Sequence, residues 1–188
     1  MPMPVAVVFL AEGFEDIEAV TVIDVLRRGG VDVTTVAVGG SLGVKSAHGI
    51  EMRADRLLEN LGEGVWDAVI LPGGMPGTEN LSKSPGVIEI LNRHAEAGRL
   101  ICAICAAPTI LSSAGILPSG THVTCYPSCA VDLDRASANV PVVVDGNFIT
   151  GQAPGSAMLF SLVVLQSLIG EEVASKIARG MVTDVLDI

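Results

Sequence analysis

The sequence is short of basic residues. Its 188 residues include 11 Lys and Arg against 21 Asp and Glu, which gives a net charge of -10. A surface of this sign repels phosphate backbones, so electrostatic binding to nucleic acid is not expected. Charged residues make up only 17% of the chain and hydrophobic residues 49%. This balance favours a deeply buried sheet or a large oligomer interface.

Long hydrophobic runs are also absent. The longest apolar stretch, Met158 to Ile169, is interrupted by Ser161, Gln166 and Ser167. It falls short of the ~20 residues that a transmembrane helix needs, so no membrane partner is expected. The N-terminal segment lacks the basic region and cleavage site of a signal peptide, and it is interpreted as a strand. We therefore expect a cytoplasmic protein.

Cysteines number only four, which favours free thiols in a reducing compartment over a disulfide framework. Cys102 and Cys105 have the spacing of a redox dithiol, and Cys125 and Cys129 extend the set toward a four-cysteine zinc site. Cys102 falls inside a predicted strand, however, and residues three apart on a strand face opposite ways. Both alternatives are therefore disfavoured, and we expect neither a metal nor a cofactor.

Apolar patterning indicates strands that alternate with helices. The continuous run from Val5 to Leu10 is typical of a strand buried on both faces. The next segment carries an apolar stripe at helical spacing that includes Ile17 and Val20. Further strands are predicted over 31–38, 68–71 and 100–104, hairpins over 44–53 and 140–150, and helices over 14–28, 54–61, 85–97, 107–114, 156–169 and 171–179. The alternation predicts an α/β fold with a doubly wound, mostly parallel sheet in a single domain over residues 1–188.

Binding sites in such folds form at the carboxyl ends of the strands. Three loops are expected there: 11–15, 72–77 and 105–108. Cys105 lies in the last of them, where a buried strand runs directly into a helix that begins near Pro108. Free backbone N–H groups and the positive end of that helix are expected to lower the pKa of the thiol and favour the nucleophilic thiolate. The alternative is a buried core cysteine.

The other two loops supply candidate partners for this thiol. Glu15 and Glu18 share a face of the first predicted helix, and burial would raise the pKa of such a carboxyl and let it donate a proton. Acidic residues in a first turn are also ordinary helix stabilisers. Gly74 allows close backbone approach, so its N–H and that of Ala106 are candidates for an oxyanion hole, although a plain turn is the alternative.

Tyr126 and His48 are the last two candidates for residues of the site. Tyr126 follows Cys125 in a Cys-Tyr-Pro turn and is a candidate for hydrogen bonding in a pocket, with a purely structural role as the alternative. His48 lies in the predicted 44–53 hairpin and is placed to reach a partner subunit. No histidine adjoins Cys105, because the next residue is Ala106, and none of the three histidines is an evident general base.

Taken in order, five segments resemble the ThiJ/PfpI superfamily: 11–18 (AEGFEDIE), 24–28 (DVLRR), 71–74 (LPGG), 103–109 (AICAAPT) and 150–155 (TGQAPG). They are most similar to the branch that contains the parkinsonism-associated protein deglycase and its bacterial relatives. The likeness extends over essentially the whole chain. It implies a flavodoxin-like sandwich, related to class I glutamine amidotransferases, with helices on both faces of the sheet. It also implies a homodimer with Asp24, Arg28 and His48 near the interface.

The resemblance also implies roles for the candidate residues. Cys105 would be an oxidation-prone nucleophile and Glu18 its protonated partner and proton shuttle. Gly74 and Ala106 would supply the oxyanion hole. Glu15, Tyr126 and His48 would line the pocket, with Tyr126 where some members have a histidine and His48 where an arginine is common.

The activity implied is that of a glutathione-independent glyoxalase or deglycase, which acts on methylglyoxal, glyoxal or their early adducts and protects against oxidative stress. The alternative is a non-enzymatic redox sensor or chaperone that works through oxidation of Cys105 to the sulfinate. Peptidases of the superfamily carry a histidine directly after the cysteine, so Ala106 argues against peptidase activity.

Overall fold

The computed structural model describes residues 3–135 and 137–183. The predicted 1–188 domain also includes residues 1–2, 136 and 184–188, which lie outside the described residues. The strands are β1 (Val5–Ala11), β2 (Asp32–Val38), β3 (Gly43–Lys45), β4 (Glu51–Arg53), β5 (Arg56–Leu57), β6 (Ala68–Leu71), β7 (Leu100–Ile104), β8 (Val142–Asp145) and β9 (Phe148–Gly151). The helices are α1 (Asp16–Arg28), α2 (Gly77–Ser82), α3 (Pro85–Glu96), α4 (Pro108–Ser113), α5 (Ala157–Ile169) and α6 (Glu171–Gly180), with 3-10 turns η1 (Leu58–Asn60), η2 (Pro127–Asp132) and η3 (Pro154–Ser156).

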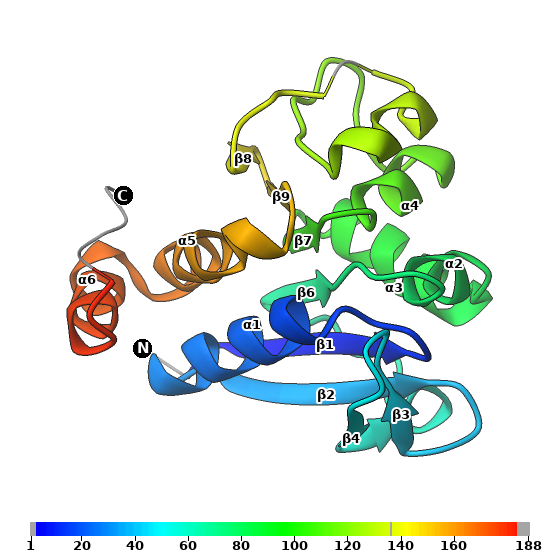
Figure 1. Cartoon of the computed structure of the whole chain (residues 1–188), viewed down its shortest axis with the longest axis horizontal. Helices are drawn as coiled ribbons and strands as arrows, with labels where there is room; N and C mark the ends of the chain where they lie inside the picture. The colour runs from blue at the N-terminus through cyan, green and yellow to red at the C-terminus, as the bar shows by residue number, and fades with distance from the viewer. Residues whose placement is uncertain (1–2, 136, 184–188) are drawn as a thin grey trace.

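Seven strands form the central sheet, in the order β5-β2-β1-β6-β7-β9-β8. All neighbouring pairs are parallel except β8 with β9, which form the predicted antiparallel hairpin. The β3–β4 hairpin stands apart as a two-stranded sheet. This arrangement confirms the predicted doubly wound, flavodoxin-like α/β fold (Figure 1).

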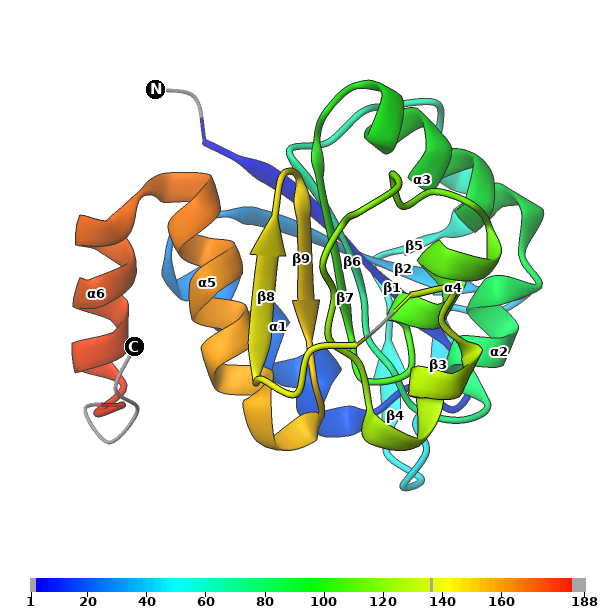
Figure 2. The same cartoon turned by 90° about the horizontal axis from the view of Figure 1, so that it is seen from above.

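Helices cover both faces of this sheet. Figure 2 shows α1, α5 and α6 toward one side of the sheet and α2, α3 and α4 toward the other. Alternate residues of β1 serve the two layers: Val8 and Leu10 belong to the core under α1 and α5, whereas Val7 and Phe9 belong to the core under α3 and α4. All four side chains are fully buried, which explains why the strand sequence is continuously apolar.

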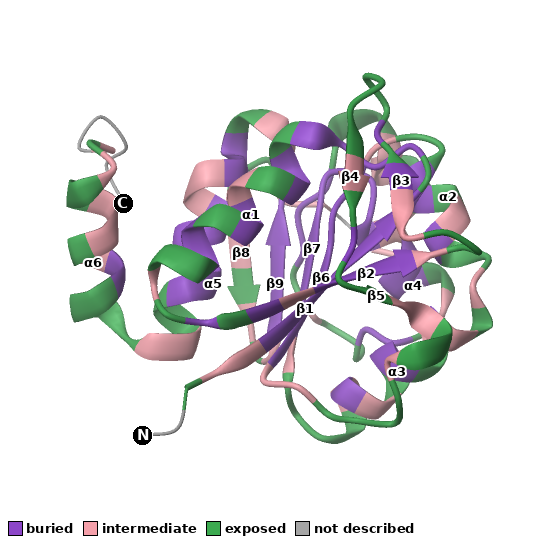
Figure 3. Ribbon diagram, turned by 90° about the horizontal axis from the view of Figure 1, so that it is seen from below, coloured by how far each residue is buried: buried purple, intermediate pink, exposed green. Residues whose placement is uncertain are grey.

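The buried strands β1, β6 and β7 are neighbours at the centre of the sheet (Figure 3). From β1 the chain moves first to β2 on one side and later returns to β6 on the other. The topological switch point therefore lies between β1 and β6. The loops that follow β1, β6 and β7 meet at the same edge, and they are the three loops that the sequence placed there.

Two short segments differ from the sequence-based predictions. The segment 54–61 was expected to be a helix, but it contains the edge strand β5 and the turn η1. Its leucines pack on the sheet and on α3 instead of forming a helical stripe, since Leu57 and Leu58 contact opposite cores. Helix α2 was not predicted, because Pro76 and Gly77 at its start resemble a loop.

The most apolar helix, α5, is covered on two sides. It packs against α1 and the sheet, and α6 lies along its outer side. The residues of α5 are accordingly buried or half-buried, except for Gln166 and Ser167, which are exposed. Within the described part of the chain, no helix has the length and apolar character that crossing a bilayer would require.

Helix α1 differs from the predicted stripe. Ala19, Val22 and Leu26 face the core, together with Ile23 and Val25. Ile17 and Val20 were assigned to the buried stripe, but they are 55% and 48% exposed. They lie on the outer face of α1, where no other described residue covers them.

Candidate active site

Backbone hydrogen bonds tie each of the three loops to a neighbouring segment at the carboxyl edge. The N–H of Glu15, at the start of α1, donates to the carbonyl of Gly73 after β6 at 3.0 Å. The N–H of Cys105, after β7, donates to the carbonyl of Gly151 at 2.9 Å. The first bond joins the start of the helix that carries Glu18 to the loop after β6, and the second joins the turn of Cys105 to β9.

Cys105 occupies a tight turn between β7 and α4. Its φ is 65°, in the left-handed region that non-glycine residues rarely adopt. The N–H of Tyr126 donates to its carbonyl at 2.8 Å, which helps to hold the turn. Strained conformations of this kind persist only where the surrounding structure enforces them, and they cluster at functional sites. Only 8% of the residue is exposed, so the thiol is presented from a largely buried position.

Glu18 is the buried carboxyl beside this thiol. It is 1% exposed, and its Oε2 accepts a hydrogen bond from the N–H of Gly73 at 2.7 Å. Its Oε1 has no hydrogen-bond partner among the described residues. Burial raises the pKa of Glu18 to about 7, while the bonds from Gly73 and Cys105 lower it and the charge of Glu15 raises it. A carboxyl with this pKa both accepts and donates protons near neutral pH.

Gly73 lies between the two side chains. A Cβ at this position would lie 2.7 Å from Cβ of Cys105 and 2.9 Å from Oε2 of Glu18. Any side chain would therefore separate the thiol from the carboxyl. Gly73 was not predicted to take part in the site, although the consecutive glycines Gly73 and Gly74 after β6 indicate close backbone approach.

The environment of the thiol contradicts the predicted low pKa. Burial raises the pKa of Cys105, and the charge and hydrogen bond of Glu18 raise it further, while the N–H groups of Ala106 and Gly74 lower it. The net direction is upward, so the prediction that the turn alone favours the thiolate is wrong. The thiolate forms most readily when Glu18 takes up the proton, because the pair then carries one negative charge instead of two.

Two backbone N–H groups face the sulfur. They belong to Gly74 and Ala106, the residues that the sequence nominated as oxyanion donors. Gly74 has a φ of 90°, and a Cβ there would lie 2.4 Å from the N of Glu15. Only glycine therefore fits this position, and the close approach of the two loops directs the Gly74 N–H at the thiol.

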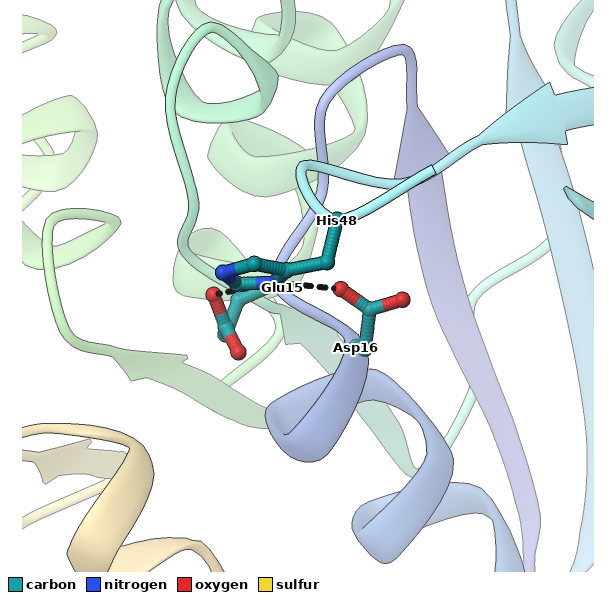
Figure 4. Close-up of side chains that lie close together, drawn as sticks. All are labelled: Glu15, Asp16 and His48. Atoms are coloured by element: carbon teal, nitrogen blue, oxygen red, sulfur yellow. Dashed lines mark hydrogen bonds and ion pairs between the residues drawn. The ribbon is translucent and has the colours of Figure 1, made fainter. Parts of the chain in front are cut away.

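A second cluster lies next to this pair at the start of α1. Figure 4 shows His48 between Asp16 and Glu15. Its Nδ1 lies 2.8 Å from Asp16 Oδ2 and 3.7 Å from Glu15 Oε2. The hydrogen bond to Asp16 and the charge of Glu15 raise the pKa of His48. Within residues 3–135 and 137–183, this is the one group of three side chains with metal-ligand spacing. The contacts are those of an ion pair, and His48 is mostly exposed.

Tyr126 and the other two histidines lie outside the pair formed by Cys105 and Glu18. Tyr126 is 43% exposed, and its contact with the site is the backbone bond to Cys105. His94 is fully buried: its ring accepts from the N–H of Trp66 at 3.0 Å and stacks on the indole. His122 pairs with Asp145 on the surface. No histidine of the described chain contacts Cys105, so a cysteine–histidine nucleophile is not formed here.

Comparisons with known proteins agree with the resemblance seen in the sequence. Residues 5–167 match the DJ-1/PfpI family model. Protein DJ-1 homolog B of Arabidopsis thaliana is 39% identical over 92% of this chain, which spans 40% of that longer relative. "Glutathione-independent glyoxalase DJR-1.2" of Caenorhabditis elegans is 33% identical, and the match covers 89% of this chain and 90% of the relative.

A solved structure shows the same architecture. The structure of oxidized Toxoplasma gondii DJ-1 matches with a TM-score of 0.92 at 32% identity, over 95% of this chain and 98% of that one. The fold agrees over nearly the whole length of both chains, and the family match includes the segments that carry Glu18, Gly74 and Cys105. The chain therefore belongs to the DJ-1/PfpI family.

Proposed function

We propose that this protein is a cysteine-dependent glyoxalase that needs no glutathione and acts on methylglyoxal, glyoxal or their early adducts with amines. The observation that carries this proposal is the pair of Cys105 and Glu18, in which a buried carboxyl with a pKa of about 7 adjoins a thiol. A thiol and a proton acceptor in contact are the minimum for attack on an aldehyde followed by proton transfer between carbons.

The first step is activation and attack. Glu18 as carboxylate takes the proton of Cys105, and the thiolate adds to the aldehyde carbon of methylglyoxal. The carbonyl electron pair moves to the oxygen, which the N–H groups of Gly74 and Ala106 stabilise as it becomes negative. Protonation by Glu18 completes the hemithioacetal and returns Glu18 to the carboxylate form.

The second step moves a hydrogen between the two carbons. Glu18 removes the proton from the former aldehyde carbon to give an enediolate. It then delivers this proton to the neighbouring carbon, while the hydroxyl proton on the former aldehyde carbon moves to the neighbouring oxygen. The product is a lactoyl thioester on Cys105, and one water hydrolyses it to lactate and free thiol. Methylglyoxal and water are thus converted to lactate without net oxidation. As a deglycase, the same thiol would attack the equivalent carbon of an adduct and release the amine.

The family membership supports this proposal, and one relative bears the name of a glutathione-independent glyoxalase. The site does not resemble that of the superfamily peptidases, since Ala106 follows the cysteine where they carry a histidine. The direct test is proton NMR of methylglyoxal incubated with the protein in buffer free of glutathione and treated with a chelator. Lactate formed in proportion to protein concentration supports the proposal. Absence of lactate with a folded protein would refute it.

Oxidation sensing is a second candidate function, favoured by the free Oε1 of buried Glu18. In the protonated form this oxygen can donate a hydrogen bond to a sulfinate on Cys105. Two molecules of hydrogen peroxide would each transfer one oxygen to the sulfur and leave as water.

Mild peroxide is therefore expected to add two oxygens at Cys105 alone, as measured by peptide mass spectrometry. Cys129 serves as the internal control, because it is a more exposed free thiol outside the pair. Oxidation of Cys129 ahead of Cys105, or oxidation of Cys105 directly to the sulfonate, would count against sensing and leave catalysis as the better account.

We also propose that the chain forms a homodimer through the outer face of α1. Exposed Ile17 and Val20 share that face with Asp24 and Arg28, which form a 2.6 Å ion pair. Exposed His48 and Ile50 lie in the β3–β4 hairpin, next to the start of α1. An apolar strip flanked by both signs of charge can pair with its own copy about a two-fold axis. The four free cysteines accord with the reducing cytoplasm that we propose as its location.

Val20→Asp is expected to shift the mass measured by light scattering from a dimer to the 19.3 kDa monomer, because it places a charge at the centre of the apolar strip. Val131→Asp is the matched control, since Val131 is 85% exposed on η2. Dissociation by both variants, or by neither, would contradict an interface on α1.

A further inference from the structure

His94 is a buried titratable side chain that the proposed mechanism does not use. It lies in the last turn of α3 and is fully buried. Both ring nitrogens have backbone partners: Nδ1 lies 2.8 Å from the carbonyl oxygen of Ile90, and Nε2 lies 3.0 Å from the N of Trp66. The ring also stacks on the Trp66 indole, with 5.5 Å between the ring centroids and 6° between the planes. One side chain therefore joins the end of α3 to the segment that enters β6.

These two partners determine where the imidazole carries its hydrogen. The carbonyl of Ile90 can only accept, so Nδ1 donates to it and holds the hydrogen. The N–H of Trp66 can only donate, so Nε2 accepts from it and is unprotonated. The ring is therefore neutral in the folded protein. A proton on Nε2 would set two donors against each other and break the bond to Trp66, even though an indole face attracts a cation.

The surroundings of the ring also oppose a positive charge. Burial lowers the pKa of His94 below its ordinary value of 6.5, and the charges of Arg93 and Arg99 lower it further, while the bond to Ile90 raises it. The carboxylate of Asp67, beside Trp66, is paired with Arg99 at 2.9 Å. The other charged groups on α3 and on the elements packed against it do not contribute to this shift; they are Glu59, Glu79, Glu89 and Glu96. The ring therefore takes up a proton only at acidic pH.

The loop before β6 is held to the fold at Trp66. Residues 62–65 are exposed, and Trp66 is the first half-buried residue after them. Its side chain packs on the core under α3 and α4, beside the ring of His94. The next residue, Asp67, is held differently, since its N–H donates to the carbonyl of Val5 at 2.9 Å. Loss of the bond between Trp66 and His94 would therefore free the loop without opening the sheet.

We propose that the contact between His94 and Trp66 is an acid-sensitive device: protonation of His94 breaks its hydrogen bond to the Trp66 N–H and releases the 62–66 loop from α3. The proton binds Nε2, and the freed N–H donates to water. The unfolded chain binds this proton more tightly than the folded chain. The stability linked to the neutral ring is therefore fully present above about pH 6.5 and is lost as the pH falls below that value. The inference does not rest on the chemistry proposed for Cys105.

Amide hydrogen exchange, followed by NMR at about pH 7.5 and about pH 4.5, tests this device on either side of the ordinary histidine pKa. Rates are expressed as protection factors, which remove the intrinsic effect of pH on exchange. The Trp66 amide should lose about tenfold in protection in acid, the factor that corresponds to one hydrogen bond. The Asp67 amide should keep its protection, because its acceptor does not titrate. Equal losses at the two amides, or no loss at Trp66, would overturn the proposal.

The position of the ring hydrogen is a second readout from the wild-type protein. The imidazole nitrogen-15 spectrum above pH 7 should show the hydrogen of His94 on Nδ1, as the bond to Ile90 requires. A hydrogen on Nε2 would contradict the acceptor role toward Trp66 and overturn the proposal.

His94→Gln identifies the group that titrates. The glutamine oxygen can accept from the Trp66 N–H but does not ionise, so the Trp66 amide should stay protected at both pH values. The matched control is His122→Gln, which removes a surface histidine paired with Asp145 and should show the wild-type loss. An undiminished loss in His94→Gln, or its disappearance in His122→Gln, would assign the titration to another group and overturn the proposal. Should His94→Gln fail to fold, the comparison of Trp66 with Asp67 in the wild type still decides. None of these readouts depends on lactate, so a negative result leaves the proposed function standing.

Discussion

Replacement of Cys105 by serine is expected to reduce the rate of lactate formation from methylglyoxal by at least about a thousandfold, while the fold is kept. The serine hydroxyl has a far higher pKa than the thiol, so Glu18, with a pKa of about 7, cannot generate a useful nucleophile from it. Serine is close to cysteine in size and should accept the same left-handed backbone. Lactate release measured by NMR tests the loss of activity, and the far-UV circular dichroism spectrum tests whether the fold is kept.

The control for this variant is Cys125→Ser. Cys125 is likewise a buried free thiol, and its sulfur lies 3.6 Å from the hydroxyl of Ser137, so a serine there keeps a hydrogen-bond partner. It should retain nearly full turnover. Equal loss in the two variants would indicate that thiol replacement only damages the fold, and full activity of Cys105→Ser would rule out Cys105 as the nucleophile.

Glu18→Gln is expected to lower kcat/KM by about a hundredfold or more, the usual range for loss of a general acid–base group. Glutamine keeps an oxygen that can accept from the N–H of Gly73, but it cannot take up the thiol proton. In the wild type, kcat/KM should fall as the pH drops below the pKa of Glu18, about 7, because the carboxylate is then lost. The variant should lack this acid limb. A wild-type profile that is flat between about pH 5 and 8 would contradict the assigned role.

The same substitution should stabilise the protein at high pH. The folded-state pKa of Glu18 is about 7 against an ordinary value of 4.5, so the folded chain holds a proton that the unfolded chain has lost between these values. The stability linked to this proton is fully present below about pH 4.5 and is lost as the pH rises through 7.

Glutamine cannot ionise and avoids that loss. Its free energy of unfolding should therefore exceed that of the wild type by on the order of 2–3 kcal/mol at about pH 8, and the gap should close at about pH 4. Urea unfolding at the two pH values measures it. If the free energies of unfolding of the variant and the wild type differ by the same amount at both pH values, burial does not raise the pKa of Glu18.

Most of the fold could be predicted from the sequence because the central strands are buried on both faces. Continuous apolar runs such as Val5 to Leu10 leave no other interpretation once helices alternate with them. The elements at the edge and on the outside of the fold were harder to predict. The segment 54–61 has leucines at helical spacing, yet they contact two different cores through β5 and η1. Ile17 and Val20 fit the helical stripe of α1 but face outward, and periodicity cannot distinguish a face that meets the core from one that meets a partner.

The residues of the candidate site and the raised pKa of Glu18 could also be predicted, but the raised pKa of Cys105 could not. The order of loops after β1, β6 and β7 was sufficient to bring Glu18, Gly74 and Cys105 together. The direction of the Cys105 pKa shift depends on burial and on the charge of Glu18, which only the folded arrangement reveals. Gly73 has no side chain, so the thiol of Cys105 and the carboxyl of Glu18 can lie close together on either side of it. This arrangement and the full burial of His94 likewise follow from tertiary packing.

The most direct test of the account is mass spectrometry of the protein quenched with acid during turnover of methylglyoxal. A hemithioacetal and a lactoyl thioester both add the mass of one methylglyoxal molecule, so we expect a transient species of that mass. Its adduct should map to Cys105, decay when the substrate is exhausted and be absent from Cys105→Ser. Lactate formation with no such adduct, or with adducts only on lysine, arginine or the other three cysteines, would contradict covalent catalysis by Cys105.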